Sequence, residues 1–144
     1  MPDTNFSVKA ESKTPTKTIV RTRNFKMIID EPEDSGGTNE GANPVEYLLA
    51  AFSGCLNVTA HMIAKEMDIQ LENLEINLEG DLNLANFEGK TLQGRPGYKE
   101  IRVELDADTD ADQKTLNRWL ANIKLRCPVY DNINNQTSVK FSVT

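Results

Sequence analysis

The sequence is poor in the residues that mark disulfide scaffolds and metal centres. It contains two cysteines and one histidine among 144 residues. Secreted domains stapled by disulfides carry cysteine at a much higher density, so any pairing of Cys55 with Cys127 points to chemistry rather than scaffolding. A zinc site built from both cysteines and His61 would lack a fourth ligand, and no paired Cys-x-x-Cys spacing occurs. We therefore expect neither a metal nor an organic cofactor.

Basic residues are also in the minority. The chain has 16 Lys and Arg against 22 Asp and Glu, which gives a formal net charge of -6 and an isoelectric point near 4.8. Modules that bind nucleic acids present a basic patch or stripe to the phosphates. This acidic chain is not expected to bind nucleic acid.

Long apolar segments are missing as well. Residues 1–20 contain no apolar stretch like that of a signal peptide, and no continuous apolar run approaches the roughly 18 residues that span a bilayer. These absences predict a cytoplasmic protein that does not associate with a membrane.

The patterns that are present predict one α+β domain over residues 1–144, with mostly antiparallel strands. Residues 1–15 are polar and predict a loose arm with at most one strand. Two strands follow, TKTIVRTR and FKMIID, joined by a turn near Asn24. The Gly-, Pro- and Asp-rich residues 31–42 predict a loop.

In the second half of the chain, apolar residues first alternate as in strands, then recur at helical spacing, and alternate again near the C-terminus. A long strand or bent pair is expected where Leu74, Ile76, Leu78, Leu82 and Leu84 share one parity, followed by a loop over residues 87–97. A further strand carries Ile101, Val103 and Leu105. A second helix is expected to open at Thr109, with Leu116, Trp119, Leu120 and Ile123 on its apolar face. After a short helix, Val139, Phe141 and Val143 predict a last strand.

The segment NPVEYLLAAFSGCLNVTAHMIAKE, Asn43 to Glu66, predicts a long helix. Asn43 suits the N-cap, Pro44 the first helical position and Glu46 the return half of a capping box. Apolar residues recur at intervals of three and four: Val45, Leu48, Leu49, Phe52, Cys55, Leu56, Thr59, Met62 and Ile63. Small residues flank this stripe: Ala50, Ala51, Ser53, Gly54 and Ala60. We infer two helix neighbours, one of which can come from another subunit.

The position of Cys55 on the apolar stripe leaves two readings open. Free cysteine often packs as a small hydrophobe in a core. Cys55 lies twelve residues beyond Asn43, about 18 Å along the helix, so the partial charge of the helix terminus does not reach it. A reactive Cys55 therefore needs a cation from elsewhere in the fold.

Cys127 lies in LRCPVYDNI, where it suits the N-cap of a short helix that Pro128 begins. Helix-terminal N–H groups and the adjacent Arg126 both favour a thiolate, so its local sequence is the more reactive of the two. The alternative is a helix-boundary residue that faces inward. His61 is six residues beyond Cys55 on a different side of the helix, which disfavours a Cys–His pair and favours a solvent-facing histidine.

Together these segments resemble the OsmC/Ohr family of thiol-dependent hydroperoxide-resistance proteins, in its OsmC-like branch. The resemblance rests on NPVEYLLAAFSGC, on CPV at 127–129 and on DEP followed by GG in the preceding loop, together with the order of elements. It covers nearly the whole chain from about Thr18.

The resemblance implies an intertwined homodimer with central helices and antiparallel sheets on its outer sides. It also implies that Cys55 attacks a hydroperoxide as a thiolate and becomes a sulfenic acid, which condenses with Cys127. An external dithiol, for example of the lipoyl type, then reduces the disulfide. The expected substrate is an organic hydroperoxide or hydrogen peroxide.

The sequence departs from the family pattern where the peroxidases carry the acid that orients an arginine. That position, ten residues before Cys55, is Val45, whereas Glu46 matches another branch of the family. Arg21 and Arg23 are candidates for the arginine and would point to the same side of a strand; Arg126 is a third. The missing acid favours a second hypothesis, a non-catalytic dimer that senses redox state or binds a small apolar ligand. A third is a structural dimer with both thiols in the core.

Overall fold

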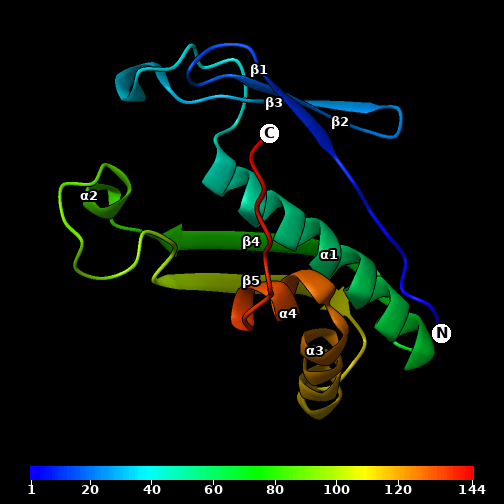
Figure 1. The fold of residues 1–144 in the computed structure, drawn as a ribbon. Coiled ribbons are helices and arrows are strands. Elements are labelled where there is room, and N and C mark those ends of the chain that lie inside the picture. The colour runs from blue at the N-terminus through cyan, green and yellow to red at the C-terminus, as the bar shows by residue number, and fades with distance from the viewer. The chain divides into compact units, whose positions relative to one another are not determined.

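The computed structural model describes residues Met1–Thr144, which divide into two compact units, Met1–Ala50 and Ala51–Thr144. Helix α1 (Pro44–Glu66) contains the boundary between them. Each unit carries its own antiparallel sheet, three-stranded in the first and two-stranded in the second (Figure 1). The chain is therefore a mixed α+β protein, as the sequence predicts.

The first unit is built on strands β1 (Lys9–Ser12), β2 (Thr18–Thr22) and β3 (Phe25–Ile29), in that order across the sheet. The prediction of two strands joined by a turn near Asn24 is confirmed, and β1 is the single strand of the N-terminal arm. Arg23 takes the left-handed backbone conformation of this turn, with φ 51°.

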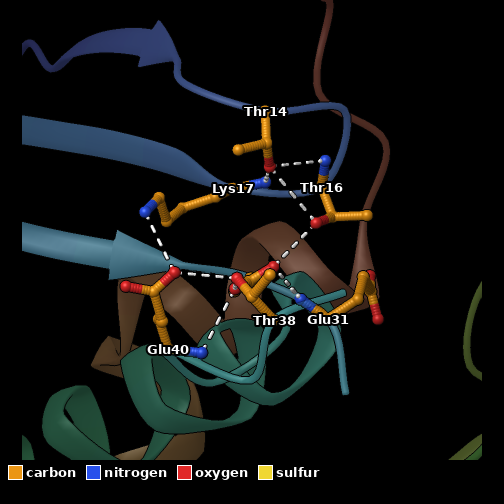
Figure 2. Close-up of polar contacts among 7 residues, drawn as sticks. Thr14, Thr16, Lys17, Glu31, Thr38 and Glu40 are labelled. Carbon is orange, nitrogen blue, oxygen red and sulfur yellow. Dashed lines mark hydrogen bonds and ion pairs between the residues drawn. The ribbon is translucent and has the colours of Figure 1, made fainter. Parts of the chain in front are cut away.

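A buried carboxylate organises the loop that leaves β3. Asp30 has no exposed surface and accepts hydrogen bonds from the hydroxyls of Thr16 (2.8 Å) and Thr38 (2.6 Å) and from the N–H groups of Glu31 (2.8 Å) and Glu40 (3.1 Å). Figure 2 shows these four partners around their shared acceptor, with the Lys17–Glu40 ion pair beside them. The loop contains the short 3-10 helix η1 (Glu33–Ser35).

The same loop needs the second glycine of its Gly-Gly pair. A Cβ on Gly37 would lie 2.0 Å from the carbonyl oxygen of Glu31, which is far inside any permitted contact. The DEP and GG segments thus have a structural role in this chain, because both set the path of the loop into α1.

The hydrogen bond from Thr38 contributes most to holding the pKa of Asp30 far below its usual range, and the other donors add to it, although burial acts in the opposite direction. A carboxyl with a depressed folded-state pKa stabilises the fold above its unfolded pKa of about 3.9 and loses that contribution as the pH falls further. We expect Asp30→Asn to lower the melting temperature by on the order of 5 °C at pH 7, measured by circular dichroism.

The difference in melting temperature between wild type and Asp30→Asn should shrink below about pH 4, because the Asp30 carboxyl of the unfolded wild-type chain then begins to bind a proton while the folded carboxyl stays ionised. Asp34→Asn is the matched control, since Asp34 is exposed on η1. Equal melting temperatures of wild type and Asp30→Asn at pH 7 would contradict the proposed organising role of Asp30.

Helix α1 begins as predicted. The Asn43 side chain accepts from the N–H of Glu46 (2.8 Å), and the Glu46 carboxylate accepts from the N–H of Asn43 (2.9 Å). This is the reciprocal capping box that satisfies two otherwise unpaired donors. The Tyr47 hydroxyl, one residue further, donates to the carbonyl of Ile28 (2.8 Å) and ties the first turn to β3.

The second unit pairs strand β4 (Leu71–Asp81) with β5 (Glu100–Thr109) and adds helices α2 (Leu84–Phe87), α3 (Gln113–Arg126) and α4 (Pro128–Asn134). Its core joins one side of α1 to α3 and to the apolar face of the sheet. The buried members of the cluster are Phe52, Leu56, Ala60, Ile63, Ala64, Ile69, Trp119, Ile123 and Cys127. The indole N–H of Trp119 donates to the carbonyl of Ala60 (2.9 Å) inside this core.

Two boundaries predicted from the sequence are wrong. Thr109 does not open the second helix, because it pairs with Leu71 at the end of β5. The helix instead begins after Asp112, whose carboxylate accepts from the N–H of Thr115 (2.8 Å). Strand β4 ends at Asp81, since the Asn83 side chain caps the short helix α2, which holds Leu84.

The predicted last strand is also absent from the single chain. Val139, Phe141 and Val143 lie in an extended segment without strand pairing and are 67%, 93% and 98% exposed. Apolar alternation predicts a strand only where a neighbouring edge accepts it, and residues 136–144 have no such partner within the chain.

One helix is long and apolar enough to cross a membrane when only length and composition are considered. It is α1, whose best 18-residue window has a mean hydropathy of 1.4. The core helix of a soluble protein passes the same test, and six residues of α1 are buried within this chain. The property is therefore weak support for a membrane span.

Candidate active site: the Cys55–Cys127 pair

The two cysteines, far apart in the sequence, meet in the second unit. Their Sγ atoms lie 2.8 Å apart, and both thiols are free. A disulfide requires about 2.05 Å between the sulfurs, so bond formation needs a movement of less than about 1 Å. The geometry permits direct sulfur–sulfur chemistry without any rearrangement of the helices.

Helix α1 places Cys55 at the edge of the core. Its neighbours Phe52 and Leu56 are buried, whereas Cys55 itself is half-buried. The Thr59 hydroxyl donates to the Cys55 carbonyl (2.8 Å), which satisfies that buried side chain within the helix. The predicted position of Cys55 on the apolar stripe is confirmed, and its partial exposure leaves a path for a small reactant.

Cys127 links two helices. Its backbone N–H donates to the carbonyl of Ile123 (3.0 Å) at the end of α3, and its Sγ accepts from the N–H of Tyr130 (3.4 Å) at the start of α4. Pro128 follows as the first residue of α4, because proline needs no hydrogen-bond acceptor there. The predicted N-cap is confirmed, and so is the inward-facing alternative, since Cys127 is only 1% exposed.

The electrostatic argument that made Cys127 the better thiolate is wrong. Burial, followed by the hydrogen bond with Cys55, raises the pKa of the Cys127 thiol, and the N–H of Tyr130 only partly opposes this. Removal of a charged sulfur from water outweighs one neutral hydrogen-bond donor. These surroundings favour the protonated form of the Cys127 thiol.

Arg126 does not act on the sulfurs as the sequence suggested. Its guanidinium binds the Glu66 carboxylate through two hydrogen bonds (2.6 and 3.1 Å) and lies 3.6 Å from the Met62 Sδ. The hydrogen bond to Glu66 also raises the pKa of Arg126. This ion pair links the end of α1 to the end of α3. The guanidinium makes its hydrogen bonds with Glu66 rather than with either cysteine.

The other three candidate site residues belong to the first unit. Glu46 is engaged in the capping box, and Arg21 lies in register between Lys9 and Lys26 across the sheet. Arg23 is not on the strand, which ends at Thr22; it lies in the turn, 4.9 Å from the centre of the Phe25 ring. The expectation that Arg21 and Arg23 point to one side of a strand is therefore wrong.

His61 is exposed on α1, as its position off the apolar stripe predicts. No group of three or more His, Cys, Asp or Glu side chains in residues 1–144 is placed to hold a metal ion.

The second unit also has a groove of about 600 Å³ that sequence reasoning missed, and neither cysteine is among its lining residues. The Phe52 and Tyr130 rings, 6.2 Å apart and stacked, contribute to its lining, and both residues neighbour the cysteines on their helices. The other apolar lining residues are Leu56, Ile101, Val103, Leu105, Ala107, Leu116, Trp119 and Leu120, and the polar ones are Asp106, Gln113, Asn117 and Lys124. The signals available in the sequence were the shared parity of Ile101, Val103 and Leu105 and the place of Leu120 on the apolar face of the predicted second helix.

Comparison with known proteins places this pair in a family context. The model of the OsmC-like protein family matches residues 37–142, which include both cysteines and all of α1. The chain belongs to the OsmC-like protein family. The resemblance seen in the NPVEYLLAAFSGC and CPV segments is thereby confirmed.

Relatives of this OsmC-like protein include both sequences and solved structures. It is 29% identical over 115 residues to the uncharacterized protein YmaD of Bacillus subtilis (strain 168), across 76% of this chain and 74% of YmaD. An OsmC-like protein from Mycoplasma pneumoniae has the same fold, with a TM-score of 0.80 at 18% identity, covering 92% of this chain and 89% of the other.

The organic hydroperoxide resistance protein OsmC from Legionella pneumophila also shares the fold. Its TM-score is 0.65 at 20% identity, with coverage of 92% of this chain and 91% of that protein. Membership of this family points to a function related to peroxide stress.

If Arg126 serves only the ion pair with Glu66, its charge is dispensable for thiol reactivity. We expect Arg126→Gln to change the rate of alkylation of either cysteine by less than about twofold at pH 7, measured by mass spectrometry of the digested protein. An exposed ion pair contributes little to stability, so the melting temperature should change by only a few degrees. A tenfold slower alkylation of either cysteine would show that Arg126 activates the site.

Proposed function

We propose that this OsmC-like protein is a thiol-dependent peroxidase that reduces organic hydroperoxides or hydrogen peroxide in oxidative-stress defence. The observation that supports the proposal is the contact of the two sulfurs, 2.8 Å apart, in which one is half-buried and the other is fully buried. A purely structural core does not require two thiols in contact at the junction of three helices.

The proposed reaction begins at Cys55. Its thiolate attacks one oxygen of the hydroperoxide, the O–O bond breaks, and the departing oxygen takes a proton to leave as an alcohol or water. Cys55 is now a sulfenic acid. The Cys127 sulfur attacks the Cys55 sulfur, the S–O bond breaks, and water leaves as the disulfide forms. An external dithiol, for example of the lipoyl type, restores both thiols.

A positive charge near Cys55 would favour its ionised form. We propose Arg21 or Arg23 as its source, with the carboxylate of Glu46 as the group that orients the guanidinium. Glu46 uses Oε1 in the capping box, so Oε2 is the oxygen available for that contact. In the peroxidase pattern an acidic residue stands at the position of Val45. Here Glu46, the next residue, takes the role of that acid.

We further propose that the protein is cytoplasmic and functions as an intertwined homodimer. The apolar surface that the single chain leaves in solvent supports this assembly. Val58 on α1 is 66% exposed, a Cβ added to Gly54 would meet no atom within 4 Å, and the three apolar residues of the C-terminal segment are also exposed.

The peroxidase proposal predicts that one equivalent of cumene hydroperoxide converts the reduced protein to an intramolecular Cys55–Cys127 disulfide. The expected observations are the loss of two thiols per chain and a mass decrease of about two units in an unreduced digest. Recovery of both thiols unchanged after excess hydroperoxide would contradict peroxidase activity.

Variants that retain one cysteine show which thiol attacks the hydroperoxide and which resolves the sulfenic acid. Cys55→Ser should abolish hydroperoxide consumption, whereas Cys127→Ser should complete one turnover and retain a sulfenic acid at Cys55, detected with a dimedone-type probe. If the probe instead labels Cys127 in Cys55→Ser, and Cys127→Ser consumes no hydroperoxide, then Cys127 is the attacking cysteine and Cys55 the resolving one.

The dimer proposal predicts a sedimentation coefficient of a dimer at micromolar concentration, with no folded monomer on dilution. Val58→Asp should weaken the assembly, because a charge at an apolar contact is costly to bury. Asn57→Asp is the control, since it adds the same charge at an exposed polar position of the same helix. A stable folded monomer of the wild-type protein would remove the intertwined arrangement.

The groove supports a second candidate function, the binding of a small apolar ligand with the cysteine pair as a redox sensor. Its volume of about 600 Å³ lies within the range of small-molecule sites. The rate of hydroperoxide consumption in the presence of a dithiol separates the peroxidase from the sensor. A sensor forms the disulfide once per oxidant pulse and is not recycled by the dithiol at a catalytic rate.

A further inference from the structure

One side of α3 forms a long wall of the groove in the second unit. Four of the lining residues recur there at intervals of three and four, which places them on one side of the helix: Gln113, Leu116, Leu120 and Lys124. The wall is polar and uncharged at the start of α3, where the Gln113 and Asn117 side chains bond each other (2.9 Å). Two leucines follow, and Lys124 lies about 16 Å further along the helix than Gln113.

Apolar side chains of the groove remain open to solvent. Val103 on β5 is 40% exposed, and Leu120 on α3 is 44% exposed. Val103 shares the parity of Ile101 and Leu105, so it stands on the face of β5 that packs toward the core. An aliphatic chain laid over Val103 and Leu120 would lose its own contact with water, and each buried methylene is worth about fourfold in affinity.

Lys124 supplies the charge of the groove. Its Nζ lies 6.0 Å from the centre of the Tyr130 ring, which also lines the groove, and it takes part in none of the ion pairs of the chain. The other charged lining residue is Asp106. It alternates on β5 with Leu105 and Ala107, which pack on the core, so its carboxylate points to the opposite face of the sheet. The groove therefore combines a long apolar wall with one unpaired cation.

We propose that the groove binds an amphiphile with a single anionic head group, of the straight-chain carboxylate class. The head group lies at Lys124, and the aliphatic chain runs along Leu120 toward the start of α3. A carboxylate completes the unpaired charge of Lys124, whereas a neutral head group does not and a cationic one is repelled. Neither cysteine lines the groove, so no thiol chemistry is assigned to this ligand. The proposal rests on the ligand-binding candidate and names its ligand class.

Two amphiphiles with the same chain, decanoate and decyltrimethylammonium, test the head group. Trp119 is the only tryptophan and lines the groove, so its fluorescence reports binding to the reduced protein, and titration calorimetry gives an independent Kd. Decanoate should bind about tenfold more tightly than the ammonium, because Lys124 attracts one head group and repels the other. The net charge of -6 would produce the opposite order at a nonspecific site.

Chain length and substitutions locate the ligand. Octanoate, with two methylenes fewer, should bind about 15-fold more weakly than decanoate. Lys124→Glu should reverse the order of the two decyl amphiphiles. Lys114→Glu is the matched control and should keep the order, since it makes the same charge change at an exposed position of α3 that does not line the groove. Leu120→Asp should weaken both amphiphiles about tenfold or more.

Equal Kd values for the two decyl amphiphiles would overturn the anionic ligand and leave the candidate of an uncharged apolar ligand. An unchanged order in Lys124→Glu, or unchanged binding in Leu120→Asp, would also overturn the proposal. A monomeric Leu120→Asp beside a dimeric wild type would identify the groove as a contact between subunits instead. No measurement involves hydroperoxide, so a protein that bound decanoate as expected but consumed no hydroperoxide would refute only the peroxidase function.

Discussion

The hydrogen bond between the Trp119 indole and the Ala60 carbonyl sets the register of α3 against α1, and the cysteine pair depends on that register. The bond is 2.9 Å long and buried, and it joins residues 59 positions apart. Ala60 is fully buried, so the small side chain lets the large indole approach the helix backbone. With this contact fixed, the end of α3 reaches α1 about one turn from Ala60, where Cys127 meets Cys55.

Burial has opposite consequences for the two kinds of ionisable group in this chain. Asp30 is buried with four hydrogen-bond donors directed at its carboxylate and remains charged. Cys127 is buried with one N–H donor and another sulfur, and remains neutral. The number and polarity of the donors, rather than burial itself, decide which state is favoured. The loop ahead of α1 therefore contains a carboxylate that stays charged, whereas the buried thiol of Cys127 keeps its proton.

Local sequence predicts an element well when all of its determinants are adjacent. The start of α1 followed from Asn43, Pro44 and Glu46, because a capping box is closed within one turn. The start of α3 was misplaced, because Thr109 and Asp112 both suit a helix start and only the pairing of Thr109 with Leu71 excludes the first. Arg126 was misjudged for a similar reason, since Glu66 is 60 positions away. The meeting of the two cysteines came from the family resemblance, because no local pattern encodes a contact across 72 positions.

The unpaired C-terminal segment also matters for handling the protein. Residues 138–144, SVKFSVT, combine β-branched and aromatic side chains, a single charge and no proline or glycine. Such a segment with a free backbone edge is a nucleus for cross-β aggregation as well as a strand ready for pairing. Solubility on expression should therefore depend on how soon this segment is covered after synthesis, and a purification tag is better placed at the N-terminal arm than after Thr144.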